Sequence, residues 1–338
     1  MGKTGSFLLS LLLMLTVSCT YFQGEKKDVK DDAYLYIRTG AGFDEVLDSL
    51  SNKLNNLNAF KQYAVAKDYP SLIKPGKYKL NKGDTNKKLL TRLILGEQEQ
   101  VPLMIANEPT IFHLAGKVAK NIEADSAQIV KSILDFAEKQ NPELNAETVK
   151  IYFIPNTYNF YWTTNGDKFV ERMLTEFDKV WTADRQQEAA AMGFTPLQVF
   201  TLASIVQMES AKKDEQPMVA KAYLNRLKIG MKLQADPTSI YAYKLQNGFN
   251  QKISRVVGMH LATPSEYNTY KVTGLPPAPI CLPNLSAVDA VLKPDTHSYI
   301  YFCADPDRPG YHSFTNSYQE HQQNAAKYRK WLEEKGIK

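Results

Sequence analysis

The sequence predicts an α+β protein with a small N-terminal subdomain and a larger mixed α+β domain that contains a buried helix. Short strand and helix patterns alternate up to about residue 100, and the pattern then changes to longer helices. A nearly continuous apolar stretch at 197–208 indicates a helix that is buried on all sides. A chain of 338 residues is long enough for two domains. We therefore expect the subdomain at 34–100 and the larger domain at 101–338.

The N-terminus has the pattern of an export segment. A single lysine precedes an apolar run at 7–17, which is short for a membrane span but typical of a signal peptide. Cys19 follows a small residue, as at a bacterial lipoprotein cleavage site. We predict that residues 1–19 are a signal peptide, a lipoprotein signal or a short membrane anchor. Residues 20–33 are predicted to be a tether, with a charged and disordered segment at 26–32.

The subdomain is predicted as a β-α-α-β-α unit. Val46, Leu47, Leu50 and Leu54 form a helical stripe, and Gly96 stands in the usual position after a helix end. The expected strands cover 34–38 and 73–80, and the expected helices cover 46–54, 60–66 and 86–95. Such a unit serves either as a packing module or as a glycan-binding module.

The composition excludes several classes of function. The net charge of +5 is small and spread along the chain, which does not indicate nucleic-acid binding. Walker-type, dinucleotide-binding and nucleophile-elbow motifs are absent from the sequence. The three cysteines, Cys19, Cys281 and Cys303, lack metal-ligand spacing, and the last two are either buried thiols or one disulfide. We expect no metal and no organic cofactor.

An aromatic segment at 151–162 lies early in the larger domain. Its rings are expected to pack in the core, although a sugar-binding cleft uses the same side chains. An amphipathic helix at 167–181 follows and leads into the apolar stretch.

The apolar stretch has the signals of a helix that ends in a carboxylate. Thr195 is a good N-cap, and the following proline is tolerated in a first helical turn. Glu209 follows Leu202, Ile205 and Val206 by seven, four and three residues, so it shares their buried face. Removal from water should raise the pKa of this carboxyl, and a protonated acid near neutral pH is what glycosidic cleavage requires.

A structural interpretation of Glu209 remains open at this point. A glutamate at a helix end is commonly a solvated cap or half of an ion pair, and Lys212 and Lys213 are close in sequence.

The next segments supply candidate walls for a cleft. A helix is expected from Pro217 to Gly230, and residues 233–240 are expected to form a loop. Gln234, Asp236 and Thr238 in that loop could bind sugar hydroxyls, or Asp236 could simply start a turn. The proline-rich segment 274–280 is rigid and suits one wall of a cleft.

Several motifs together resemble a known family. ASIVQMES, AYLNRLKIGMKLQADPTSIY, YNTY, GLPP, SYIYFCAD and HSF occur in this order from residue 203 to residue 314. This combination resembles the YceG-like family, the MltG-type endolytic murein transglycosylases, from about Tyr34 onward. The resemblance implies a LysM-like N-terminal subdomain and lysozyme-like chemistry on peptidoglycan. It assigns the catalytic acid to Glu209.

The resemblance also implies a reaction. Lytic transglycosylases cleave the MurNAc-β-1,4-GlcNAc bond and form 1,6-anhydro-MurNAc ends without consuming water. One acid can serve both halves of that reaction. We assign substrate binding to Gln234, Asp236, Thr238, Tyr267, Asn268 and Tyr270. His312 either orients the substrate or holds the end of a strand.

Two other functions remain open. Asp236 as a second carboxylate would make the protein a hydrolytic muramidase. Glu209 as a mere helix cap would leave a non-catalytic peptidoglycan-binding envelope protein. From the resemblance we expect a membrane-anchored protein of the cell envelope, with its catalytic domain in the periplasm and penicillin-binding synthases as partners. The family role is to limit the length of nascent glycan strands in cell wall assembly.

Overall fold

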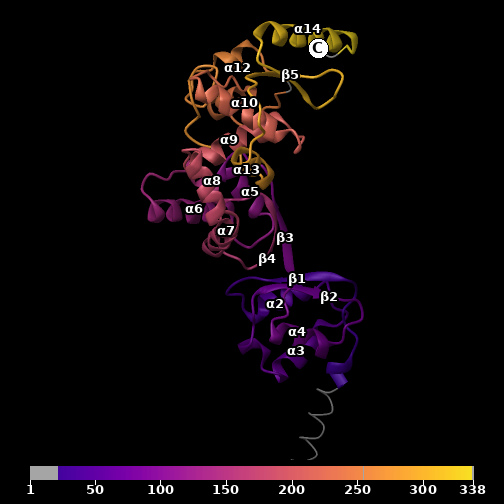
Figure 1. Ribbon diagram of the computed structural model, residues 1–338. Coiled ribbons are helices and arrows are strands. Elements are labelled where there is room, and N and C mark those ends of the chain that lie inside the picture. The colour runs from indigo at the N-terminus through magenta and orange to yellow at the C-terminus, as the bar shows by residue number, and fades with distance from the viewer. Residues whose placement is uncertain (1–21, 254, 337–338) are drawn as a thin grey trace, which may run out of the picture. The chain divides into compact units, whose positions relative to one another are not determined.

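The computed structural model describes residues 22–253 and 255–336, which form two compact units (Figure 1). The predicted export segment at residues 1–19, including Cys19, lies outside the described residues. Unit 1 contains the described residues up to Leu103 together with Ala119–Asp125 and Tyr158–Asn165. Unit 2 contains Met104–Val118, Ser126–Thr157 and the residues from Gly166 onward. The observed units differ from the predicted domains, which meet after residue 100, because two later segments belong to the small unit.

Unit 1 is built on a two-stranded antiparallel sheet. Strand β1 (Ala33–Ile37) pairs with β2 (Gly76–Leu80), with Leu35 opposite Tyr78. The other elements are α2 (Phe43–Leu50), α3 (Leu57–Ala66), the 3₁₀-helix η1 (Tyr69–Ser71) and α4 (Asn86–Leu95). Leu35, Leu50 and Phe60 are fully buried in the core between the sheet and the helices.

The segment 26–32 is ordered, so the prediction of a disordered tether is wrong there. Val29 is 2% exposed and forms an isolated bridge with Leu54. The Asp28 side chain is fully buried, and its Oδ1 accepts the backbone N–H of Asn56 at 2.7 Å. The high charge density of the segment led to this error, because the segment also contains Val29, which packs in the core, and Asp28, whose carboxylate accepts an N–H at the N-terminus of α3.

Strands β3 (Gln100–Ile105) and β4 (Asn156–Tyr161) form a second two-stranded sheet, and the division between the units falls within both strands. Unit 2 contributes a third sheet, in which β5 (Tyr301–Ala304) pairs with β6 (His312–Thr315). Its helices are α5 (Ile111–Val118), α6 (Ser126–Gln140), η2 (Thr148–Tyr152), α7 (Gly166–Val180), α8 (Ala183–Ala191), α9 (Pro196–Glu209), α10 (Gln216–Lys228), α11 (Asp236–Asn247), α12 (Gly258–Ala262), α13 (Leu285–Leu292) and α14 (Tyr318–Glu334). The predicted α+β class is confirmed.

Helix α9 is the centre of unit 2. Thr195 and Gln198 form a reciprocal capping box, with the Thr195 Oγ1 accepting the Gln198 N–H at 3.2 Å. Every residue of this helix from 199 to 206 is buried, and it packs against α8, α10, α11 and α13. Burial of a leucine or isoleucine side chain contributes roughly 1.5–3 kcal/mol to stability, so this helix fixes the position of whatever its last turn carries.

Two further sequence expectations are resolved in unit 2. Residues 233–240 are not one loop, because Asp236 and Pro237 begin helix α11, where proline fits the first turn. Cys281 and Cys303 are free thiols rather than a disulfide, and burial raises the pKa of Cys281 to about 12.

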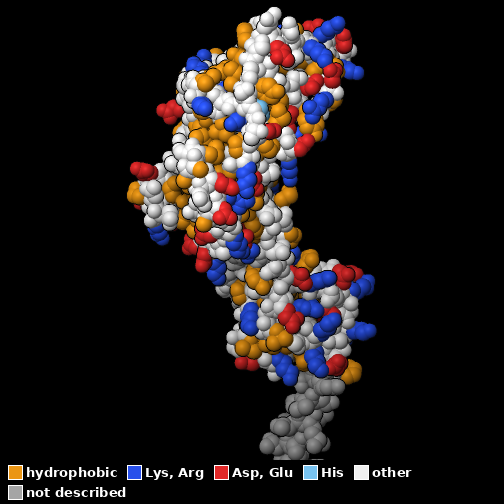
Figure 2. Space-filling view, in the orientation of Figure 1, with side chains coloured by type: hydrophobic (Ala, Val, Ile, Leu, Met, Phe, Trp, Pro, Cys, Tyr) orange, Lys and Arg blue, Asp and Glu red, His pale blue; other side chains and the backbone are white. Residues whose placement is uncertain are grey.

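The surface carries both signs of charge. Figure 2 shows Lys, Arg, Asp and Glu side chains interspersed on the visible face, in keeping with the small net charge. Within residues 22–253 and 255–336, no single helix has the length and apolarity to cross a membrane. Helices α8 and α9 meet that test only as a pair, which is bent by 85°.

Candidate active site

The candidate site is centred on Glu209, the last residue of α9. Leu202, Ile205 and Val206 on the same face are fully buried, whereas the Glu209 side chain keeps partial access to solvent. Removal of the carboxyl from water raises the pKa of Glu209 from 4.5 to about 7. The expected rise in pKa is thereby confirmed, and Glu209 is not half of an ion pair with Lys212 or Lys213.

A buried tyrosine on α10 holds the Glu209 carboxyl. The hydroxyl of Tyr223 donates a hydrogen bond to Glu209 Oε1 at 2.6 Å, and the tyrosine is 1% exposed. This bond favours the carboxylate and partly opposes the effect of burial on the pKa of Glu209. Neither the apolar stripe of α10 nor any motif predicted this contact, because it depends on how α10 packs against α9.

Arg226 brings a positive charge to the same place. Its Nε donates to the carbonyl of Ile300 at 2.6 Å, and its Nη1 donates to the carbonyl of Leu233. The guanidinium lies 5.8 Å from the centre of the Tyr223 ring. Its charge lowers the pKa of Glu209, so it favours the carboxylate form of that residue. The sequence signal that could have indicated this role is the spacing of Arg226, three and seven residues after the buried Tyr223 and Val219.

Asp236 and Tyr270 are paired beside the site. The Tyr270 hydroxyl donates to Asp236 Oδ1 at 2.6 Å, and the Asp236 side chain is exposed. The negative charge of Asp236 raises the pKa of Glu209, which places the two carboxyl groups within electrostatic range. Gln234 is also exposed and adopts a left-handed backbone conformation with φ of 49°. The prediction that these three residues bind substrate stays a prediction.

Thr238, Tyr267 and Asn268 are instead inside the protein. Thr238 and Asn268 are fully buried, and Tyr267 is 7% exposed. The Thr238 hydroxyl donates to the carbonyl of Ala235 at 2.7 Å, and the Asn268 amide donates to the carbonyl of Thr263 at 2.8 Å. Direct contact with a saccharide is therefore excluded for these side chains in this conformation. Their hydrogen bonds hold the loop and helix that carry Asp236 and Tyr270.

A second glutamate close to Glu209 holds His312. Glu215 Oε2 lies 2.9 Å from His312 Nδ1 and accepts the Ser210 hydroxyl at 2.8 Å. Glu215 Oε1 accepts the backbone N–H of His312 at 2.6 Å. These bonds lower the pKa of Glu215 although burial opposes them. His312 is thus held at the start of β6, and its charge also lowers the pKa of Glu209, so both sequence interpretations stay predictions.

A pocket of about 420 Å³ lies beside His312 and Glu215. Polar and aromatic side chains dominate its lining, which includes Asp214, Tyr299, Arg308 and Tyr311. Among the residues that the structure describes, no group of three or more His, Cys, Asp or Glu side chains is placed to hold a metal ion.

Comparison with known proteins gives a consistent result. The model of the YceG-like family matches residues 35–327. A Bacillus subtilis (strain 168) protein named endolytic murein transglycosylase is 25% identical over 320 residues, which cover 90% of this chain and 86% of that protein. A Streptococcus pneumoniae (strain D39) protein of the same name is 26% identical over 297 residues, covering 80% of this chain and 53% of that protein's length.

A solved structure is similar in fold. The crystal structure of a yceG-like protein from Listeria monocytogenes aligns with a TM-score of 0.58 at 24% identity and covers 87% of this chain and 98% of that chain. At this identity the likeness concerns the fold. Since the family model spans most of the sequence, the chain belongs to the YceG-like family.

Proposed function

We propose that this protein is a lytic transglycosylase that cleaves the β-1,4 bond between N-acetylmuramic acid and N-acetylglucosamine within peptidoglycan strands. The observation that carries the proposal is the Glu209 carboxyl itself, which stands at the end of the buried helix α9, accepts the Tyr223 hydroxyl at 2.6 Å and has a pKa that burial raises to about 7. The two relatives that are named endolytic murein transglycosylase support the choice of substrate.

One acid accounts for the whole reaction. Protonated Glu209 gives its proton to the bridging oxygen as the bond from that oxygen to C1 of the muramoyl residue breaks. The Glu209 carboxylate then takes the proton of the muramoyl 6-hydroxyl, whose oxygen forms a new bond to C1. The product is a 1,6-anhydro ring, no water is consumed, and Glu209 is protonated again. A pKa near the working pH suits an acid that must also act as a base.

The neighbours of Glu209 stabilise the carboxylate that exists between the two proton transfers. The Tyr223 hydroxyl, at 2.6 Å from Oε1, and the Arg226 guanidinium both favour the carboxylate that exists between the two proton transfers. Asp236 and Tyr270 lie within electrostatic range of the acid, and we assign them, together with the exposed Gln234, to binding of the sugar hydroxyls. Thr238, Tyr267 and Asn268 position these residues from inside the protein.

A hydrolytic muramidase is the second candidate, and one observation favours it. Asp236 is an exposed carboxylate close enough to Glu209 to raise its pKa. A hydrolase needs such a second carboxylate as nucleophile or as base for a water molecule. The transglycosylase is preferred because Asp236 already accepts the Tyr270 hydroxyl and because one acid suffices for the anhydro product.

Digestion of purified peptidoglycan tests the proposal. The wild type should release fragments with 1,6-anhydro ends, and Glu209→Gln should lower the rate by about 10³-fold because the proton donor is lost. Glu171→Gln, an exposed change on α7, is the matched control and should cleave normally. Mass spectrometry reads the products. Fragments heavier by one water would show hydrolysis, and wild type that releases nothing would show a non-catalytic binding protein.

The remaining parts of the proposal concern the cell. We propose that cleavage occurs within strands and limits the length of nascent glycan during cell wall assembly. Anchoring through residues 1–19, a lipid on Cys19, a periplasmic catalytic domain, penicillin-binding synthases as partners and the LysM-like character of the subdomain all stay predictions.

A further inference from the structure

One face of the sheet in unit 1 carries aromatic rings and a lysine into solvent. Along β1 the side chains alternate, with Leu35 and Ile37 buried and Tyr34 and Tyr36 more than 40% exposed. Lys77 stands opposite Tyr36 in the register of β1 and β2. Its Nζ lies 4.0 Å from the centre of the Tyr34 ring and 6.0 Å from that of Tyr36.

Trp162 is held against this face by its backbone. Its carbonyl accepts the Glu123 N–H at 2.7 Å. The Glu123 carboxylate in turn accepts the backbone N–H of Thr39 at 2.8 Å and the Thr39 hydroxyl at 2.6 Å. The indole packs edge-on against Tyr36 with ring centres 5.1 Å apart and remains partly exposed. All of these residues belong to unit 1.

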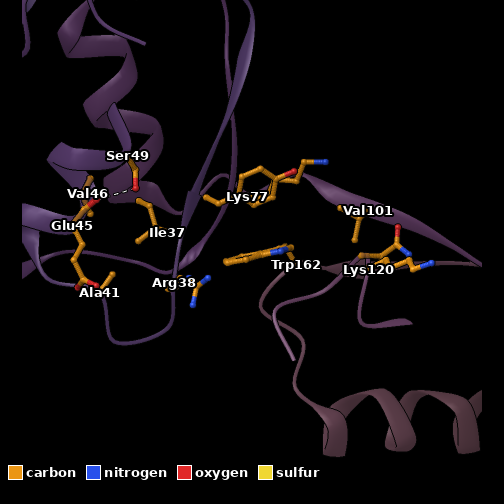
Figure 3. Close-up of a pocket in the computed structure, with 12 residues that line it drawn as sticks. Ile37, Arg38, Ala41, Glu45, Val46, Ser49, Lys77, Val101, Lys120 and Trp162 are labelled. Atoms are coloured by element: carbon orange, nitrogen blue, oxygen red, sulfur yellow. Dashed lines mark hydrogen bonds between the residues drawn. The ribbon is translucent and has the colours of Figure 1, made fainter. Parts of the chain in front are cut away.

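The rings line an open groove of about 660 Å³ that is rich in cations. Arg38, Lys77 and Lys120 contribute positive charges to its wall, and in Figure 3 Arg38 and Lys120 lie on opposite sides of the Trp162 indole. Within the described part of the chain, none of these three cations has a carboxylate partner within 4.0 Å.

The only carboxylate among the described residues that line the groove is already committed to the fold. Glu45 Oε2 accepts the backbone N–H of Gly42 at 2.8 Å, at the start of α2. The groove therefore combines a partly exposed indole with positive charges that no carboxylate of the described residues neutralises. The indole can pack on the apolar face of a pyranose, and guanidinium and ammonium groups bind carboxylates through charge-assisted hydrogen bonds.

We propose that this groove binds a muramoyl peptide, with a sugar ring on Trp162 and the carboxylates of the peptide on Arg38, Lys77 and Lys120. The preference for an anionic ligand with a sugar ring follows from the groove itself. The choice of a muramoyl peptide among such ligands rests on the proposed function. The site needs segments 119–125 and 158–165, so it is not contained in the subdomain expected at 34–100.

A ligand that cannot be cleaved separates binding from catalysis. In the disaccharide-peptide GlcNAc-MurNAc-peptide the sugars are joined through C1 of GlcNAc, so the bond from C1 of MurNAc to a following GlcNAc, which the proposed reaction cleaves, is absent. This ligand can be titrated into the full chain by calorimetry. We expect the double variant Arg38→Gln/Lys120→Gln to bind it at least about tenfold more weakly, since two charge-assisted contacts are lost. The control Lys61→Gln/Lys67→Gln removes the same charge from α3 and its C-cap, outside the groove, and should bind like the wild type. Thermal melts verify that both variants are folded.

Neutral and lipid ligands complete the test. An uncharged N-acetylglucosamine trimer should bind more weakly than the disaccharide-peptide and should be indifferent to the double substitution. Equal affinity of wild type and double variant for the disaccharide-peptide would overturn the proposal. Binding of phosphatidylglycerol vesicles, but not of the disaccharide-peptide, through the same cations would also overturn it by identifying a membrane surface.

Failure of the proposed function would look different. Glu209→Gln that still cleaves peptidoglycan would refute the assignment of the acid. The titration with the uncleavable disaccharide-peptide would be unchanged by that result, because it reports only on the groove of unit 1.

Discussion

Glu209 and Glu215 lie at the two ends of one short connection, between α9 and α10, and their carboxyl groups are shifted in opposite directions. Burial raises the pKa of Glu209 to about 7, whereas hydrogen bonds lower the pKa of Glu215. Glu215 has the smaller exposed surface, at 4%, whereas the Glu209 carboxyl is enclosed by more protein atoms. Burial raises the pKa of both carboxyl groups, so the sign of each net shift depends on how far hydrogen bonds oppose that rise.

The hydrogen-bond donors account for part of the difference between the two pKa shifts. The Glu215 carboxylate accepts hydrogen bonds from the backbone N–H of His312 and from the Ser210 hydroxyl, and it also contacts Nδ1 of the His312 ring. Glu209 receives one hydroxyl, from Tyr223. Several donors stabilise a carboxylate inside a protein, and one neutral donor does not offset the loss of water. Glu215 is thus stabilised as a carboxylate, whereas burial favours the protonated form of Glu209, as its proposed role as the acid requires.

Stability measurements should show this contrast most strongly. The pKa of Glu215 is lowered on folding, so its charge adds stability above pH 4.5, and this contribution is lost as the pH falls through the folded pKa. Glu215→Gln should therefore lower the free energy of unfolding at pH 8 by about 2–3 kcal/mol, with a smaller loss near pH 4. Urea denaturation at the two pH values measures both effects.

Glu209→Gln should act with the opposite sign. Its folded pKa of about 7 exceeds 4.5, so ionisation between these values costs the folded state stability as the pH rises. The amide removes this cost and can still accept the Tyr223 hydroxyl. The variant should match the wild type near pH 4 and exceed it by about 2 kcal/mol above pH 7. A loss of stability at pH 8 in both variants would refute the contrast.

Tyr223→Phe tests how much the hydrogen bond from the Tyr223 hydroxyl contributes to the pKa of Glu209. The Tyr223 hydrogen bond lowers the pKa of Glu209, so its loss should raise that pKa further. Since the first step needs protonated Glu209, activity falls as the pH rises past this pKa, and the fall should move to higher pH. The maximal rate should drop about tenfold, because the carboxylate between the two steps loses its donor.

A pH profile of kcat for peptidoglycan cleavage measures this effect. Tyr243→Phe on α11, where the ring packs edge-on against His260, is the matched control and should leave the profile unchanged. A Tyr223→Phe profile that coincides with the wild type would mean that the hydroxyl does not act on Glu209.

The sequence predicted what depends on local pattern. The capping residue Thr195, the apolar run and the position of Glu209 on a buried face were all readable, because helix periodicity places them without knowledge of the rest of the fold. The donor Tyr223 was not, since its hydroxyl reaches Glu209 only through packing of α10 on α9. The charged segment at 26–32 misled for the same reason, because its core residue Val29 contacts distant parts of unit 1.

Side-chain direction was the other limit. Asp236 and Thr238 stand two residues apart at the start of α11, yet one is exposed and the other fully buried. Reading 233–240 as a loop gave no basis for separating them, whereas the first turn of a helix turns successive residues to different faces. Trp162 was recognised as core or cleft, but its place in a groove of unit 1 depends on pairing with Tyr36, which is far away in sequence.

Asp236→Asn is the mildest way to test the site, and it decides between the two candidate reactions. The charge of Asp236 raises the pKa of Glu209, so its removal should lower that pKa and move the fall in activity slightly to lower pH. The Tyr270 hydroxyl can still donate to the Asn oxygen, which keeps the loop in place. For a transglycosylase that uses Glu209 alone, kcat/KM at the optimum should change by only about two- to threefold.

A hydrolase would respond quite differently to the same substitution. Asp236 would then be the nucleophile or the base, and its loss should lower the rate by about 10³-fold, close to the effect of Glu209→Gln. Product masses from Asp236→Asn digests give the second readout. Suppose that Asp236→Asn still forms 1,6-anhydro ends at a nearly unchanged rate. Then Asp236 does not take the proton of the sugar hydroxyl, and that proton goes to the carboxyl that protonated the bridging oxygen. That result would leave Glu209 as the single acid and base.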